Sequence, residues 1–285
     1  MKRLLIGSMV TGALVLALVW LAPAAVSLAA AQRGAAGTAT APAATPPAPV
    51  PRMADGHPDL SGVWWPGSDI GGRRGAGAGR GGARGGGRGG TPPPSFTSLY
   101  QPWAVEKAKT LADKDDPSLR CIPTAFGTLN VSLFSVGAVG QIVQTPKFVV
   151  MLTETYHGFQ LIPTDGRPHR DDVPPAYRGD AVGRWEGDAL VVDTKNFSDS
   201  TWMFAEGRVS FHSDALHIVE RYRRVDANTL EIDATVEDPK VLTAPWTVPK
   251  QTLQLAPFDQ IMALNCSGIE TQSLMDAAAK LNDKK

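Results

Sequence analysis

The sequence predicts a mostly β protein, in which an antiparallel meander closes into a lipocalin-like barrel with short flanking helices. About nine short apolar or alternating runs follow one another, and turn-forming residues separate them. Alternation is clearest from Leu230 to Val236, where apolar side chains share one face and Glu231, Asp233 and Thr235 share the other. No helix of useful length separates these runs, so consecutive strands pair as hairpins. Closure into a barrel then removes the open edges of the sheet.

The first residues predict an export signal. Lys2 and Arg3 precede an apolar stretch over residues 4–21, and alanines lead up to Gln32. These are the three parts of a cleavable signal peptide, so we expect residues 1–31 to be removed. The mature protein would act in the periplasm or outside the cell, with no stable membrane span. The alternative is an uncleaved anchor, because the apolar run is nearly long enough to cross a bilayer.

Composition then divides the mature chain into segments. An Ala/Pro/Thr-rich segment contains almost no large apolar side chain and is interpreted as a disordered tether. A Gly/Arg-rich segment is interpreted as a disordered insertion that separates the first strand from the rest of the fold. The predicted limits are 32–55 for the tether, 56–66 for the first strand, 67–95 for the insertion, 96–270 for the barrel domain and 271–285 for a C-terminal helix or tail.

Charge and motif content exclude several partners. From Ser95 onward, 19 Lys and Arg stand against 25 Asp and Glu, which argues against a nucleic-acid surface. The Gly-rich tract over residues 71–90 lacks the Lys-Ser or Lys-Thr ending of a phosphate loop. We therefore expect no nucleotide and no other cofactor.

The individual elements follow in order. Residues from Gln101 to Asp113 suit a short helix with Pro102 in its first turn. A terminal helix is expected over Ser273–Leu281, where Leu274 and Leu281 share one side. The strands between them are expected at Gln141–Gln144, Phe148–Leu152, Phe159–Ile162, Val182–Trp185, Leu190–Asp193, Leu216–Val225, Leu230–Val236, Gln251–Leu255 and Ile261–Leu264.

Cys121 and Cys266 are the two cysteines of the chain. An exported chain with an even number of cysteines usually pairs them, so we expect a disulfide that ties the start of the folded domain to its end. Two buried thiols are the alternative. Their spacing does not indicate a metal site.

Several long motifs occur in a fixed order and carry a resemblance. They are Asp165–His169, Val182–Asp188, Leu190–Thr194, His212–Ser213, Leu216–His217, Val219–Arg221, Val236–Pro239 and Pro245–Thr247. In these motifs the chain resembles a large family of uncharacterised secreted bacterial proteins, over roughly Asp115 to Cys266. The resemblance implies export and domain limits. It implies no activity and no catalytic residue.

The run from Leu216 to Val225 carries ionisable side chains on both faces, since His217 and Arg221 alternate with Glu220, Tyr222 and Arg224. Whichever face turns inward buries polar groups, which persist only when they are paired or hydrogen-bonded. Such an interior would hold the acid and base of an enzyme, orient a ligand, or form a structural salt-bridge ladder. We expect His217, with Glu220 or Asp193 nearby, in a solvent-reachable polar pocket with apolar walls.

A second candidate cluster comprises Asp193, Asn196, Trp202 and His212, on a loop that leaves one strand and returns toward another. Loops at a barrel mouth often carry function, and an Asp beside a His can form a general acid–base pair. The alternative is structural: Asp193 and Asn196 cap the turn and Trp202 plugs the barrel end.

No metal and no nucleophile motif is expected. Four of the five histidines, His157, His169, His212 and His217, fall close together, but no pair has the spacing of a known metal motif. In a regular strand His212 and His217 would lie on opposite faces. Ser213 has no Gly-x-Ser-x-Gly surroundings.

Three functions are compatible with these residues. The first is a secreted or periplasmic barrel that binds a small, partly apolar ligand through Asn196, Trp202, Arg221 and Tyr222. The second is a cofactor-free lyase, isomerase or hydrolase that uses His217, Glu220, Asp193 and His212 as acid and base. The third is a cell-surface or matrix interaction protein.

Overall fold

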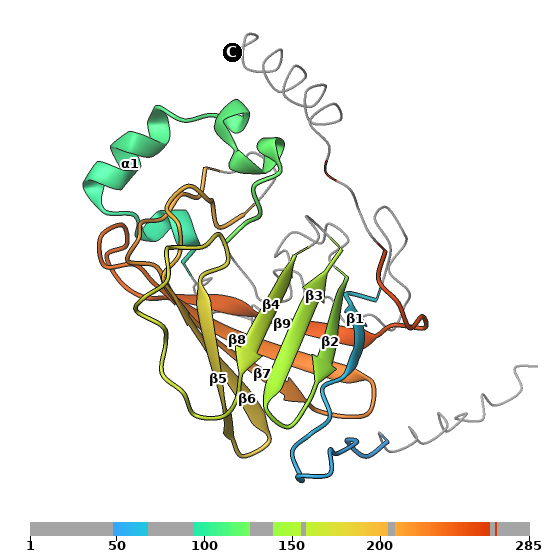
Figure 1. The fold of residues 1–285 in the computed structure, drawn as a ribbon. Helices are drawn as coiled ribbons and strands as arrows, with labels where there is room; N and C mark the ends of the chain where they lie inside the picture. Colours follow the sequence, from blue (N-terminus) through green and yellow to red (C-terminus); the bar gives the residue numbers. More distant parts are fainter. Residues whose placement is uncertain are drawn as a thin grey trace, which may run out of the picture. The chain divides into compact units, whose positions relative to one another are not determined.

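The computed structural model describes residues 48–67, 94–125, 139–154, 158–204, 209–262 and Cys266 (Figure 1). All of them belong to the unit Pro46–Lys285. The expected signal peptide, most of the tether, most of the Gly/Arg insertion and the expected terminal helix lie outside the described residues.

The described residues form a nine-stranded antiparallel sheet that is nearly closed into a barrel, which confirms the mostly β meander. The strand order is β4-β3-β2-β1-β9-β8-β7-β6-β5. The first strand pairs with both β2 and β9, so it joins the two halves of the meander. The bounds are β1 Gly62–Trp65, β2 Gly140–Gln144, β3 Phe148–Thr153, β4 Phe159–Pro163, β5 Asp180–Glu186, β6 Ala189–Lys195, β7 His217–Arg224, β8 Thr229–Glu237 and β9 Trp246–Leu255.

The seam between β4 and β5 follows from the odd number of strands. Because every neighbouring pair in the order is antiparallel, the two strands at its ends run in the same direction. Consecutive parallel strands cannot be joined by a hairpin and need a crossover that returns along the barrel. Residues 164–179 are this crossover segment. No ladder joins β4 to β5, but a Cβ on Gly183 of β5 would lie 2.9 Å from Ile162 Cγ2 of β4, so the strands pack closely.

Side-chain alternation decides what the barrel encloses. On β8, Leu230, Ile232, Ala234 and Val236 are buried, as the alternation predicts. On β7 the buried side chains are Ile218, Glu220, Tyr222 and Arg224, so His217 and Arg221 lie on the outer face. The apolar core inside the barrel contains Leu60, Trp64, Ile142, Val149, Met151, Ile162, Leu190, Val192, Leu230, Ile232 and Leu253.

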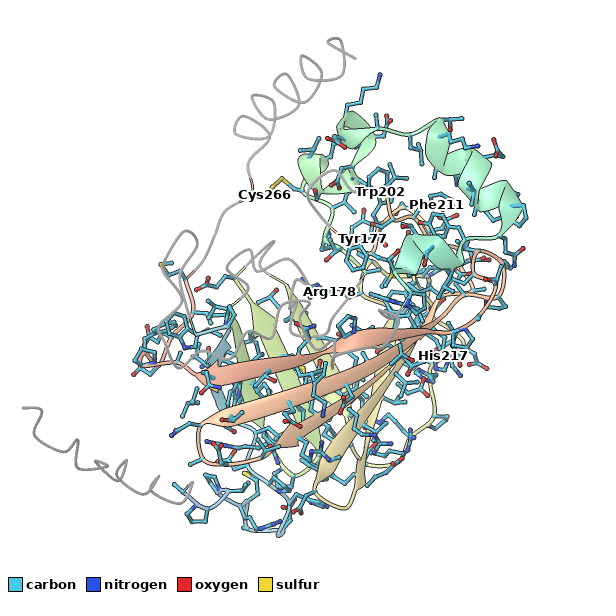
Figure 2. The ribbon with its side chains drawn as sticks, turned by 180° about the vertical axis from the view of Figure 1, so that it is seen from behind. Tyr177, Arg178, Trp202, Phe211, His217 and Cys266 are labelled. Carbon is cyan, nitrogen blue, oxygen red and sulfur yellow. A yellow bond between two sulfur atoms is a disulfide. The ribbon has the colours of Figure 1, made fainter. Side chains whose placement is uncertain are left out.

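A cap of short helices and loops covers one end of the barrel (Figure 1). The helix α1 spans Pro102–Lys109, within the predicted range, with proline at its first turn. Three 3-10 helices accompany it: η1 Phe96–Leu99, η2 Asp113–Asp115 and η3 Pro117–Arg120. Aromatic side chains form the cap core, and Figure 2 shows Trp202 and Phe211 beside the short helices. The hydroxyl of Tyr100 donates to the Phe211 carbonyl at 2.9 Å.

The predicted strand Ile261–Leu264 is wrong in its described part, because Ile261 and Met262 have no strand structure. Instead, the Met262 amide donates to the Glu154 carboxylate at 2.7 Å. The last strand also begins earlier than expected, at Trp246. Its ladder with β8 shifts register between Ile232 and Ala234. The resulting bulge in β9 accommodates Pro249, and this proline interrupted the strand pattern in the sequence.

The expected disulfide is confirmed: Cys121 and Cys266 are bonded, with their Cα atoms 5.7 Å apart. It joins the residue that follows η3 in the cap to a residue beyond β9. Among the described residues, no helix is long and apolar enough to cross a membrane.

Candidate functional site

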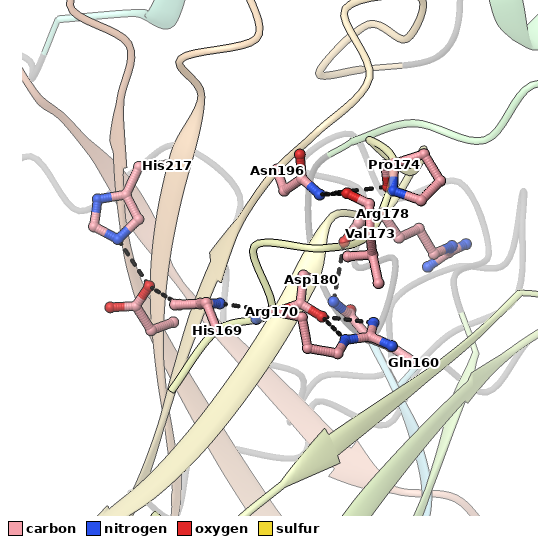
Figure 3. A network of polar contacts seen from close by, with 10 residues as sticks. Gln160, His169, Arg170, Val173, Pro174, Arg178, Asp180, Asn196 and His217 are labelled. Atoms are coloured by element: carbon pink, nitrogen blue, oxygen red, sulfur yellow. Dashed lines mark hydrogen bonds and ion pairs between the residues drawn. The ribbon is translucent and has the colours of Figure 1, made fainter. Parts of the chain in front are cut away.

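A row of alternating carboxylates and imidazoles crosses the outer face of the barrel, and we call it the imidazole–carboxylate chain (Figure 3). Asp193 Oδ1 on β6 lies 2.9 Å from His169 Nε2 and 3.0 Å from His217 Nε2. The other ring nitrogens face carboxylates too, with His169 Nδ1 3.2 Å from Asp180 Oδ2 and His217 Nδ1 3.2 Å from Glu237 Oε2. The chain therefore links β5, the crossover segment, β6, β7 and β8.

Sheet register places these groups together. His217 and Glu237 are directly opposite partners on β7 and β8, and Asp193 faces Val219, two residues from His217 on the same face. Only His169 comes from outside the sheet. An imidazolium donates from both nitrogens, whereas a neutral imidazole has one N–H. Each ring can thus donate to both of its carboxylates only as the imidazolium, with a proton on each nitrogen.

The pKa of Asp193 lies below its ordinary value. Burial raises this pKa, but the hydrogen bond of His169, the charge and hydrogen bond of His217 and the charge of Lys195 together lower it further. Asp180 shows the same balance: burial raises its pKa, while the amide and guanidinium of Arg170 and the ring of His169 lower it below the ordinary value. Both carboxylates are therefore ionised in the folded protein at neutral pH.

A pocket of about 460 Å³ opens at the seam between β4 and β5, and we call it the seam pocket. Asp180 and Arg170 both line this pocket. Asp180 also belongs to the imidazole–carboxylate chain, and Arg170 donates to Asp180. The pocket is lined by Phe159, Gln160, Leu161, Pro163, Arg167, Pro168, Arg170, Ala176, Arg178, Gly179, Asp180, Ala181 and Val182. It thus combines an apolar β4 wall with arginines from the crossover segment.

Close packing holds Arg178 at this seam. Its Nη2 donates to Thr153 Oγ1 at 3.1 Å, and Gln160 Nε2 donates to its carbonyl at 3.0 Å. A Cβ on Gly158 would lie 2.4 Å from Arg178 Nη2 and 2.7 Å from Thr153 Oγ1. Only glycine leaves room for the guanidinium there, and this local requirement was not visible in the sequence pattern.

Asn196 fastens the crossover segment to the end of β6. Its φ is 58°, a left-handed conformation that Asn adopts more readily than most residues. Its side-chain amide donates to the carbonyls of Val173 and Pro174 at 3.0 and 3.3 Å, and its own carbonyl accepts from the Ala176 amide. This arrangement matches the structural alternative for Asn196, in which it organises a turn.

Glu220 and Tyr222 lie inside the barrel, on the face of β7 opposite to His217. The hydroxyl of Tyr222 donates to Glu220 Oε1 at 2.9 Å, and both residues are almost fully buried. Glu220 is therefore not beside His217, and only Asp193 of the two expected carboxylates reaches that ring. Arg221 lies on the outer face, where its Nη2 bonds Glu186 at 2.7 Å.

His212 and Trp202 belong to the cap. His212 Nε2 lies 2.7 Å from Thr201 Oγ1 and its Nδ1 lies 2.8 Å from the Ser213 carbonyl. Burial lowers the pKa of His212, which keeps its ring neutral. The structure does not bring it to Asp193, whose imidazole partners are His169 and His217. Trp202 is 6% exposed and packs in the cap core, as expected if it plugs the barrel end.

Sequence reasoning did not select His169, Arg170 or Arg178 as site residues. His169 stood among the clustered histidines and in the Asp165–His169 motif, which was the available signal. Its contacts with Asp180 and Asp193 depend on the return path of the crossover segment. Within the described ranges, no group of three or more His, Cys, Asp or Glu side chains is arranged to hold a metal ion.

Comparison of the chain with protein-family models, with curated proteins and with solved structures finds no match.

Proposed function

We propose that the protein binds a small, partly apolar anion in the seam pocket. The observation that carries this proposal is the composition of the pocket wall, where Phe159, Leu161 and Pro163 of β4 face a crossover segment that supplies three arginines. Ligand pockets commonly have about 300–1,000 Å³ and combine apolar walls with a few placed polar groups. The seam pocket fits both criteria.

Charge supports an anionic ligand. Arg167, Arg170 and Arg178 line the pocket, whereas Asp180 is the acidic residue among its described lining residues. Two of the guanidinium groups are held by carboxylates: Arg167 bonds Asp165 through Nε and Nη2, and Arg170 bonds Asp180 through Nε and Nη2. A guanidinium has five N–H donors, so each arginine is oriented and keeps further donors. A carboxylate or phosphate group suits such donors best.

Exposed apolar surface supports an apolar part of the ligand. Phe159 is 67% exposed and Leu161 is 49% exposed, and both line the pocket on the outer face of β4. Their cross-strand partners on β3 are Leu152 and Val150, so the apolar surface continues onto the next strand. A contiguous exposed apolar patch is typical of a binding site. The disulfide supports action in an oxidising compartment outside the cytoplasm.

The first test uses octanoate as the probe, with octan-1-ol and octylamine as ligands of equal chain length. Titration calorimetry is expected to show octanoate binding at least about tenfold more tightly than either control, because only its head group pairs with the arginines. Arg167→Gln is expected to weaken octanoate binding about tenfold. Arg223→Gln is the matched control. Arg223 lies on the outer face of β7, pairs with Glu231 of β8 and does not line the pocket. Equal affinity for the three probes would contradict the proposal.

A cofactor-free acid–base enzyme is a second candidate, favoured by the imidazole–carboxylate chain. The chain begins at Asp180 in the pocket wall and continues through His169, Asp193 and His217. Imidazoles held by carboxylates can take up and release protons near neutral pH. In this candidate His169 exchanges a proton with a ligand beside Asp180, and the rest of the chain stabilises its charge.

His217→Gln separates the two candidates, because glutamine keeps a hydrogen bond to Asp193 and cannot carry a proton near pH 7. Conversion of the bound ligand is followed by nuclear magnetic resonance in wild type and variant. Turnover that is lost while affinity and melting temperature are unchanged identifies the enzyme. No turnover in either protein, with the same affinity in both, identifies the binder, because His217 does not line the seam pocket.

A further inference from the structure

A second, much smaller cavity lies inside the barrel, next to the seam pocket. It has a volume of about 10 Å³. Gln160 and Arg178 line both spaces, so the cavity adjoins the pocket. The remaining described lining residues are Ala125, Thr194, Phe197, Ile218 and Glu220, which come from the cap and from the inner faces of β6 and β7.

Thr194 is the unusual member of this lining. The residue is 2% exposed, and among the residues that the structure describes its Oγ1 has no hydrogen-bond partner. Buried hydroxyl groups are nearly always bonded, either to protein or to an ordered water molecule. The register of β6 and β7 puts Thr194 opposite Ile218, two residues from Glu220 on the same inner face. The unsatisfied hydroxyl thus lines the same cavity as a buried carboxylate.

We propose that this cavity is a binding site for one ordered water molecule, which bridges the Thr194 hydroxyl and the Glu220 carboxylate. A cavity holds a water molecule when it offers about 10–15 Å³ and two to four polar partners. The observed volume meets the lower bound, and Thr194, Glu220, Gln160 and Arg178 provide the polar groups. Glu220 accepts from Tyr222 through Oε1, and a carboxyl group has further acceptor positions through which it can bond the water.

The site is distinct from the function proposed for the seam pocket and does not depend on it. A bound water gives the Thr194 hydroxyl the partner that the described protein residues do not supply. It also hydrates a carboxylate inside a barrel whose other inner side chains are largely apolar. The cavity and the seam pocket share Gln160 and Arg178 as lining residues, so the water lies next to that pocket.

Thr194→Val tests the site, because valine has nearly the same shape as threonine and lacks the hydroxyl. If the water is present, the variant loses a bridge and its melting temperature falls by about 2–6 °C. If the cavity is dry, the substitution removes only an unpaired hydroxyl, and the melting temperature stays the same or rises. Thr201→Val calibrates the measurement, since Thr201 is equally buried and its Oγ1 contacts His212 and the Ser198 carbonyl.

A crystal structure of the wild-type protein at about 1.5 Å provides the direct observation, and it decides the question even if Thr194→Val fails to fold. Electron density for one water within hydrogen-bond distance of Thr194 Oγ1 and Glu220 is expected. An empty cavity would overturn the proposal, and so would a Thr194→Val melting temperature at or above that of wild type.

Discussion

The variant in which serine replaces both Cys121 and Cys266 is expected to lose up to about 5 kcal/mol of the free energy of unfolding. The two residues are 145 positions apart, so the bond restricts a large part of the unfolded chain. In the chain-entropy description, loss of this restriction stabilises the unfolded state and leaves the native contacts intact. Urea unfolding of the oxidised wild type and the double variant measures the difference.

Reductant provides the internal control for this prediction. It should shift the unfolding midpoint of wild type toward that of the double variant and leave the double variant unchanged. Equal midpoints for the oxidised wild type and the double variant would show that the bond between the cap and the chain beyond β9 adds no stability.

Asp193→Asn is expected to lower the free energy of unfolding by about 1–3 kcal/mol at neutral pH. Asparagine keeps an acceptor oxygen but removes the charge that both imidazoles face, and the three side chains are only 21–23% exposed. Asp188→Asn is the control, because Asp188 pairs with Arg52 at an exposed position and should contribute less.

The pH dependence of this effect follows from the lowered pKa of Asp193. A carboxylate whose folded pKa lies below its unfolded value stabilises the protein above the unfolded pKa of 3.8, and this contribution disappears as the pH falls through the folded pKa. The stability difference between wild type and Asp193→Asn should therefore be full at pH 6–7 and shrink below about pH 4. A difference that is constant across this range would assign the effect to packing.

Hydrogen exchange locates the structural consequence of the same substitution. Asp193 holds His169, and the neighbouring Arg170 amide donates to Asp180 at 3.1 Å. Loss of the Asp193 charge is expected to accelerate amide exchange in the crossover segment while β8 and β9 stay protected. Unchanged exchange in residues 164–179 would show that contacts other than the one between His169 and Asp193, such as those of Asn196 and Arg178, hold this segment to the barrel.

Much of the fold was predictable because its signals are local. Alternation along Leu230–Val236 identified both β8 and its buried face, and proline in the first turn identified α1. The errors also have local causes. The bulge within β9 interrupted its pattern, and the apolar run at Ile261 resembled a strand although no partner strand pairs with it in the described structure.

The candidate site was only partly predictable. The sequence indicated that His217 and Asp193 belong together, and they are 3.0 Å apart. It grouped Glu220 and His212 with them, whereas Glu220 faces the barrel interior and His212 lies in the cap. Side-chain alternation separates Glu220 from His217. His212 and Asp193 are close in the chain, but the intervening loop carries His212 into the apolar cap.

By itself, the sequence predicted most of the strands, the hairpins between neighbouring strands and the pairing of Cys121 with Cys266, because these depend on nearest neighbours along the chain or on residue counts. Only the tertiary structure decided which face of β7 turns inward, since both faces carry ionisable groups and their burial depends on the neighbouring strands. It also decided the seam: nine antiparallel strands leave β4 and β5 parallel, and the crossover that this requires brings His169, Arg170 and Arg178 to one place.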